Sequence, residues 1–214
     1  MSTTHIYLIR HGQSEGNLRQ TFLGHFDLDL TETGHEQAER TAEYLESIHA
    51  DAIYSSDLKR AYSTALHTAR RKGMAIIKNE NLREIYAGEW EGRPFDELIV
   101  EYKEEYGRFR ENIGLAHPTG GESVAELRDR FVGELERIAS ANEGKSVFVF
   151  THATPIRATK ATLDGLTLDE MQSVPWASNA SVTHVVWEDG CFKVVEYGRD
   201  DFMGECATNL PASV

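Results

Sequence analysis

The sequence is short of cysteine and of long apolar runs. Among its 214 residues only Cys191 and Cys206 are cysteines, and they do not form a C-x-x-C pair. So few cysteines argue against a disulfide framework and against a thiolate zinc site. No apolar stretch approaches the roughly 20 residues that a membrane-spanning helix needs, so we expect no membrane partner. The opening segment Met1–Thr4 also lacks the basic start and the apolar core of a secretion signal, and we therefore expect a cytoplasmic protein.

The sequence also has few positively charged residues. Lys and Arg number 22 against 35 Asp and Glu, which gives a formal net charge of −13. Such a protein repels nucleic acids and anionic membranes, and no run of Lys or Arg compensates. We therefore expect no nucleic acid partner. A small anion can still bind where a few arginines locally reverse the field, so the positions of individual arginines matter.

The chain also lacks linkers rich in Pro, Gly or Ser, internal repeats and low-complexity runs. We therefore expect one domain over residues 1–214. Apolar patterns typical of strands alternate with helical patterns, and the strands are expected at residues 5–9, 52–55, 75–77, 146–150, 181–187 and 192–197. The last two are expected to form a hairpin. This alternation predicts an α/β fold with a mostly parallel, helix-covered sheet, whose ligands bind beyond the carboxyl ends of the strands.

Capping signals indicate where several helices begin. Thr31, Asp57 and Ser123 each precede a stretch with helical apolar spacing, and each is an expected N-cap. Ser123 also forms an expected capping box with Glu126. Residues 95–106 show a further continuous helical pattern.

The most informative segment follows the first expected strand and begins with Arg10 and His11. Gly12 permits a sharp exit from the strand, and Ser14 is the expected N-cap of a helix whose N3 residue is Asn17. A strand that leads through a loop into a helix start forms an anion cradle. The Arg10 guanidinium and the backbone N–H groups could grip a phosphate there, which leaves His11 free to attack it.

The expected strand at 146–150 has the same arrangement, because His152 follows its carboxyl end. Thr154 is the expected N-cap of the next helix, with Pro155 in the first helical position. His11 and His152 would converge on one pocket if their two strands were neighbours. The sequence alone leaves that condition open.

Two further side chains suit the same chemistry. Arg60 takes the third position of the helix capped by Asp57, where the macrodipole disfavours a cation, so a bound phosphate, Asp57 or simple exposure could compensate. Glu84 lies in a loop punctuated by glycine, where a carboxyl group either approaches a ligand or is solvated. Together with His11 these residues supply a nucleophile, cations for the phosphoryl oxygens and a proton donor, as phosphoryl transfer requires.

Four separated segments of the chain resemble, in the same order, those of the histidine phosphatase superfamily, the phosphoglycerate mutase-like group. They are R-H-G-x-S-x-x-N at 10–17, S-D-L-x-R-A-x-x-T-A at 56–65, L-R-E-I-x-x-G-x-W-E-G at 82–92 and the strand-terminal histidine followed by P-I-R at 155–157. The G-G-E-S turn at 120–123 adds to the match. The resemblance spans nearly the whole chain and implies a three-layer α/β/α sandwich with a mostly parallel central sheet.

The resemblance also implies roles for the residues of these motifs. His11 would become phosphorylated, and the phosphoryl oxygens would be held by Arg10, Arg60, His152 and Asn17. Glu84 would protonate the leaving alkoxide in the first step and deprotonate the attacking water in the second. The substrate implied is a small phosphorylated metabolite, and neither a metal nor a cofactor is expected.

Two departures from the family pattern bear on the expected activity. Ala153 and Thr154 stand where two glycines are common, which keeps open a binding module that has lost catalysis. Gly16 stands where mutase-type members usually have a tryptophan, which favours hydrolysis. The loop after Glu84 is also more similar to the phosphatase branch, including members that act on α-ribazole phosphate. We therefore expect a metal-independent phosphomonoesterase; the alternatives are a 2,3-bisphosphoglycerate-dependent phosphoglycerate mutase and a binding module that has lost catalysis.

Specificity is the least determined property. Leu23, Gly24, Tyr86 and Trp90 are expected to form the pocket wall because of their positions in the motifs. The tail Met203–Val214 either folds over the site or extends from it. The sequence names no particular metabolite and leaves a homo-oligomer open.

Overall fold

The computed structural model describes residues 2–208. A six-stranded sheet forms its centre, in the order β4 (Ile76–Lys78), β3 (Ala52–Ser55), β6 (Ser146–Thr151), β1 (Thr4–Arg10), β7 (Val182–Glu188) and β8 (Cys191–Arg199). The first four are parallel, whereas β7 runs antiparallel to β1 and forms a hairpin with β8 at the edge of the sheet. The predicted mostly parallel sheet and its edge hairpin are confirmed.

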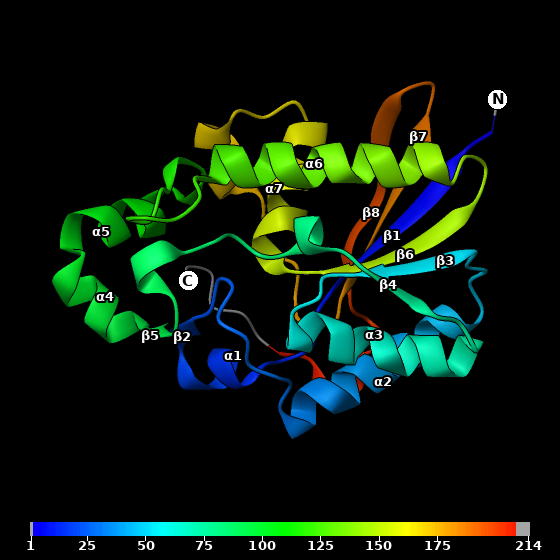
Figure 1. Cartoon of the computed structure of the whole chain (residues 1–214), viewed down its shortest axis with the longest axis horizontal. Helices are drawn as coiled ribbons and strands as arrows, with labels where there is room; N and C mark the ends of the chain where they lie inside the picture. The colour runs from blue at the N-terminus through cyan, green and yellow to red at the C-terminus, as the bar shows by residue number, and fades with distance from the viewer. Residues whose placement is uncertain (1, 209–214) are drawn as a thin grey trace.

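Helices cover both faces of this sheet (Figure 1). On one face lie α2 (Glu32–Glu46) and α3 (Lys59–Lys72), and on the other lie α6 (Val124–Ala141) and α7 (Ala153–Leu163). Alternate residues of β1 point to opposite faces. Leu8 packs with Phe131 of α6, whereas Ile9 packs with Leu45 of α2, and all four side chains are buried. The expected three-layer sandwich is therefore present.

The strands β1 and β6 are direct neighbours. Arg10 pairs with Thr151 in the parallel register. The carboxyl ends of both strands therefore meet at the same point of the sheet, and the condition for bringing His11 and His152 together is met.

A separate group of short elements lies beside the sandwich, on the left in Figure 1. It comprises α1 (Glu15–Arg19), the two-stranded sheet of β2 (Thr21–Phe22) and β5 (Arg93–Pro94), α4 (Phe95–Glu101) and α5 (Lys103–Glu111). Short 3₁₀ helices occupy Glu80–Leu82, Gly88–Trp90, Ile113–Leu115, Leu168–Ser173 and Gly204–Cys206. Trp90, which is fully buried, lies in the apolar core of this group with Phe22 and Phe109.

The continuous helix predicted over 95–106 is wrong, because α4 and α5 are separated at Tyr102. The backbone there has φ −113° and ψ 40°, outside the helical region. Packing accounts for the break, since the Tyr102 ring lies edge-on to Trp90 and its hydroxyl donates to Glu89 at 2.8 Å. The turn lets Tyr106 of α5 reach the same indole, with ring centroids 5.3 Å apart.

The predicted N-caps Ser14, Thr31 and Ser123 are confirmed, each by a bond from a backbone N–H of the first helical turn to the side-chain oxygen. Asp57 is not a cap. The N-cap of α3 is Leu58, and the N–H of Lys59 donates instead to Asp27 Oδ1 at 2.7 Å.

Asp57 is engaged elsewhere, because its carboxylate accepts a bond from Arg83 Nε at 2.7 Å. That ion pair lowers the pKa of Asp57. Arg60 consequently occupies the second position of α3 rather than the third.

The predicted start of the last helix is also wrong. His152 is the N-cap of α7, so Ala153, Thr154 and Pro155 are already in its first turn. The reason is the short connection: β6 ends at Thr151, and the chain turns into the helix at the next residue. No helix within the described residues is long and apolar enough to cross a membrane.

Candidate active site

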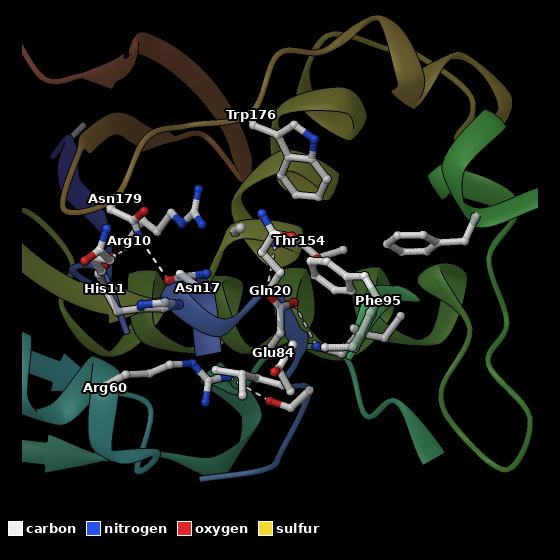
Figure 2. Close-up of a pocket in the computed structure, with 18 of the residues that line it drawn as sticks. Arg10, His11, Asn17, Gln20, Arg60, Glu84, Phe95, Thr154, Trp176 and Asn179 are labelled. Atoms are coloured by element: carbon white, nitrogen blue, oxygen red, sulfur yellow. Dashed lines mark hydrogen bonds between the residues drawn. The ribbon is translucent and has the colours of Figure 1, made fainter. Parts of the chain in front are cut away.

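A cavity of about 580 Å³ opens beyond the carboxyl ends of β1 and β6. Its inner part is lined by the predicted site residues Arg10, His11, Asn17, Leu23, Gly24, Arg60 and Glu84. These residues come from three separate parts of the sequence, at 10–24, 60 and 84, and Figure 2 shows their labelled members around one hollow. The cavity is thus at the position where a parallel α/β sheet binds its ligands.

His11 is held at the centre of this group. Its ring Nδ1 lies 2.7 Å from the Gly12 carbonyl, which can only accept, so Nδ1 carries the proton and Nε2 keeps its lone pair. Burial lowers the pKa of His11 well below its ordinary value, and the charges of Arg60 and Arg10 lower it further. The imidazole is therefore neutral and nucleophilic at pH 7.

Close packing explains why a glycine follows His11. The φ of Gly12 is not positive, so no conformation reserved for glycine is required. A Cβ atom there would instead lie 2.4 Å from the Gly34 carbonyl oxygen, at the start of α2. The Gly12 N–H also donates to Thr64 Oγ1 at 3.0 Å. Close packing between the loop and two helices thus places the His11 ring.

The two arginines are buried and lack carboxylate partners among residues 2–208. Arg10 Nη1 donates to the Ala177 carbonyl at 2.6 Å, and Arg60 Nη2 donates to the Gly24 carbonyl at 2.7 Å. The Nε atoms of both make no hydrogen bond to any described residue. Burial lowers the pKa of each to about 10, and the nearby charge of Glu84 opposes that shift. Both guanidinium groups therefore stay charged and can bind an anion.

Glu84 is fixed by backbone donors. Its Oε1 accepts from the N–H of Ile85 at 2.8 Å, and its Oε2 accepts from the N–H of Thr154 at 3.2 Å. Because Thr154 is in the first turn of α7, its N–H is not used by the helix. The dipeptide Ala153-Thr154 thus places the start of α7 against the Glu84 carboxylate.

His152 lies behind His11 rather than at the cavity surface. The two rings meet edge-on with centroids 5.2 Å apart, and His152 Nε2 lies 2.9 Å from Ser56 Oγ. His152 is fully buried, and its Nδ1 has no hydrogen-bond partner among the described residues. Burial and the charge of Arg60 lower its pKa well below the ordinary value. Its predicted contact with phosphoryl oxygens stays a prediction.

Asn17 is tied to the same loop. Its Oδ1 accepts from the Ser14 N–H at 3.1 Å and from Asn179 Nδ2 at 3.3 Å. Asn179 Nδ2 also lies 3.2 Å from the His11 carbonyl oxygen. Thr208 Oγ1, in the tail, donates to Asn179 Oδ1 at 3.1 Å, so the described part of the tail does reach the cavity. Residues 209–214 lie outside the described residues.

The predicted pocket wall is partly wrong. Leu23 and Gly24 line the cavity, but Trp90 is fully buried in the neighbouring core and Tyr86 lies on the surface. The sequence reasoning also missed most of the outer wall, which includes Phe95, Ile99, Tyr106, Phe109, Arg110 and Trp176, and it missed Asn179 beside His11. They belong to segments without a motif, and no local signal marks them.

Comparison with known proteins identifies the family of this chain. Residues 6–200 match the model of the histidine phosphatase superfamily, branch 1. Phosphoserine phosphatase 1 of Hydrogenobacter thermophilus is 36% identical over 184 residues, which cover 86% of this chain and 87% of that protein.

Solved structures give the same result. YhfR of Bacillus stearothermophilus superposes with a TM-score of 0.90 at 30% identity, over 94% of this chain and 99% of that one. The phosphoglycerate mutase of Bacillus anthracis superposes with a TM-score of 0.81 at 25% identity, over 96% and 97% of the two chains. These similarities support a phosphatase activity and a phosphoglycerate mutase-like fold. Nearly the whole chain takes part in these matches, and it belongs to branch 1 of the histidine phosphatase superfamily.

Proposed function

We propose that this protein is a phosphomonoesterase that hydrolyses a small phosphorylated metabolite through a phosphohistidine at Nε2 of His11. The observation that carries the proposal is a neutral, buried imidazole between two guanidinium groups that have no carboxylate partner among residues 2–208. A dianionic phosphoryl group would neutralise Arg10 and Arg60, which both line the cavity. The phosphorus atom then lies within reach of the His11 lone pair.

The first half of the reaction forms the phosphoenzyme. The Nε2–P bond forms as the P–O bond to the alcohol breaks, and Arg10 and Arg60 stabilise the charge on the three phosphoryl oxygens. Glu84, protonated at this stage, donates its proton to the leaving alkoxide. The backbone N–H groups of Ile85 and Thr154 keep that carboxyl group in place.

The second half returns the enzyme to its starting state. Glu84, now a carboxylate, removes a proton from water, and the water oxygen attacks phosphorus as the Nε2–P bond breaks. Inorganic phosphate leaves and Glu84 is protonated again. Since guanidinium groups supply the positive charge and His11 the nucleophile, the proposed cycle uses no metal ion.

The test is phosphate release from simple monoesters such as ethyl phosphate and p-nitrophenyl phosphate, with and without a chelator. We expect turnover in both conditions, a phosphoenzyme that is labile in acid, and loss of both in His11→Ala. His49→Ala is the control, because His49 is exposed on the surface. Turnover or phosphoenzyme formation that persists in His11→Ala would refute the proposal.

A mutase is the second candidate, favoured by the structural similarity to the phosphoglycerate mutase of Bacillus anthracis. The two activities differ in whether water or a second alcohol takes the phosphoryl group from His11. Efficient conversion of 3- to 2-phosphoglycerate, stimulated by the bisphosphate and with little phosphate release, would replace hydrolysis by the mutase reaction.

A further inference from the structure

The outer half of the cavity has a different character from the inner half. Its walls carry the aromatic rings of Phe22, Phe95, Tyr106, Phe109 and Trp176, together with the aliphatic side chains of Ile85 and Ile99. Figure 2 shows Trp176 and Phe95 on the side away from Arg10 and His11. This composition is suited to an apolar body rather than to a short polar one.

Contacts with neighbouring groups position Trp176 and Phe95 at the cavity. The Arg157 guanidinium lies 4.3 Å from the Trp176 ring, and its Nε donates to the Val174 carbonyl at 2.7 Å. The Phe95 N–H donates to the Gln20 carbonyl at 3.0 Å, which fixes the start of α4 beside the cavity. Both side chains are half-buried, so each keeps surface for a ligand.

The charged residues of the cavity wall narrow the class of substrate further. Among the described lining residues Glu84 is the one carboxylate, and we assign it to the inner end of the cavity, where the phosphoryl group would react. Arg110, at the end of α5, is the one charged residue of the outer wall. An ammonium group such as that of phosphoserine would find no anion in this part of the cavity.

We propose that the preferred substrate is a phosphomonoester whose flat apolar body packs between Phe95 and Trp176. This inference rests on the proposed function. The body carries no positive charge, and an anionic group at its far end pairs with Arg110. The bond that breaks and the proton transfers are those of the cycle described above.

Binding of phosphonates to the whole chain tests this class without turnover. We expect 2-phenylethylphosphonate to bind about tenfold more tightly than ethylphosphonate, by calorimetry, because one ring leaves water. Trp176→Ala and Phe95→Ala should each reduce that ratio about threefold or more, whereas Trp176→Phe should keep most of it. Phe192→Ala, an aromatic truncation on β8 outside the cavity, should leave the ratio unchanged.

A second pair of ligands tests the charge. A para-carboxylate on the phenyl ring should bind about threefold more tightly than a para-aminomethyl group, as expected of an exposed ion pair. Arg110→Gln should remove that preference. Arg108→Gln, an exposed arginine on the same helix, should keep it.

Failure of this inference differs from failure of the proposed function. The substrate class would be overturned if 2-phenylethylphosphonate and ethylphosphonate bound equally well. It would also be overturned if Phe192→Ala reduced the ratio of their affinities as much as Trp176→Ala and Phe95→Ala do. Either result could occur even if His11-dependent hydrolysis is present. Conversely, a tenfold ratio of the two phosphonate affinities without hydrolysis of any monoester would support the proposed class of ligand and refute the proposed phosphatase activity.

Discussion

At the scale of single residues, the environment of His11 determines what the imidazole can do. The Gly12 carbonyl sets the tautomer, and burial with two neighbouring cations keeps the ring neutral. Burial also leaves the arginines with donors that protein atoms do not use. A phosphoryl group would relieve both conditions, because its negative charge compensates the cations and its phosphorus accepts the lone pair.

Arg60 should contribute mainly to the transition state. Arg60→Ala is expected to lower kcat for p-nitrophenyl phosphate by about 100-fold or more, as loss of one preorganised donor to developing charge typically does. The measurement is steady-state phosphate release. Arg70→Ala, an exposed arginine on the same helix, should change it little, and equal effects of the two substitutions would contradict the role.

The buried histidines should make stability depend on pH. In the folded state the pKa of His152 lies well below its ordinary value, whereas in the unfolded chain it is about 6.5. Below about pH 6.5 the unfolded chain therefore binds more protons than the folded chain. The contribution of His152 to the free energy of unfolding is greatest above that pH and decreases as the pH falls.

Urea unfolding at pH 7.5, 6.5 and 5.5 measures this effect. His152→Asn should weaken the pH dependence, and His49→Ala, an exposed histidine, should not. A wild-type stability that rises on acidification over this interval would contradict the buried neutral ring.

At the scale of elements, the start of α7 links the sheet to the Glu84 carboxylate, the proposed proton donor. The helix begins directly after β6, and its first turn presents the Thr154 N–H to Glu84. A family member with two glycines here would have the same backbone donor, so the substitution by Ala153 and Thr154 keeps this contact. The break between α4 and α5 acts similarly, because it brings Tyr106 to the cavity wall.

Removing that donor should reduce catalysis. Thr154→Pro eliminates the N–H in the first helical turn, where proline is tolerated, and should lower kcat about tenfold or more through loss of a hydrogen bond to a charged group. Thr154→Ala keeps the N–H and isolates the contribution of the side chain. An equal loss of kcat in both variants would show that the N–H does not matter.

At the scale of the whole molecule, a chain with net charge −13 encloses a cavity with three arginines and one glutamate in its wall. The surrounding negative field disfavours long polyanions, whereas a small dianion that enters the cavity meets a local excess of positive charge. Under the proposed function, the whole charge distribution would therefore favour small phosphorylated molecules over polyanions.

Inorganic phosphate should therefore stabilise the folded chain. At 100 times its Kd it should add about 2.7 kcal/mol, which corresponds to a rise in Tm of roughly 5–10 °C for a chain of this size. Differential scanning fluorimetry over a phosphate titration measures the shift at constant ionic strength, with chloride as the control. The shift should vanish in Arg10→Ala, and an undiminished shift there would place the phosphate elsewhere.

Local patterns in the sequence were sufficient for the six strands of the central sheet, its layers and most helix starts, but not for the short strands β2 and β5. Ser14, Thr31 and Ser123 cap their helices because a cap needs only a side-chain oxygen that accepts a hydrogen bond from a backbone N–H two or three residues later. The same reasoning failed at Asp57, whose carboxylate is taken by Arg83, 26 residues further along the chain. A local rule cannot anticipate a distant competitor for the same side chain.

The sequence by itself determined the alternation of strands and helices, the excess of negative charge and the motifs that place His11, Arg60 and Glu84 in the chain, since each depends on residue type and short-range spacing. Tertiary structure decided that β1 and β6 are neighbours, that His152 lies behind His11, and that Phe95 and Trp176 face one cavity. The physical reason is that a cavity wall is made by packing, and packing brings together residues whose separation along the chain carries no signal.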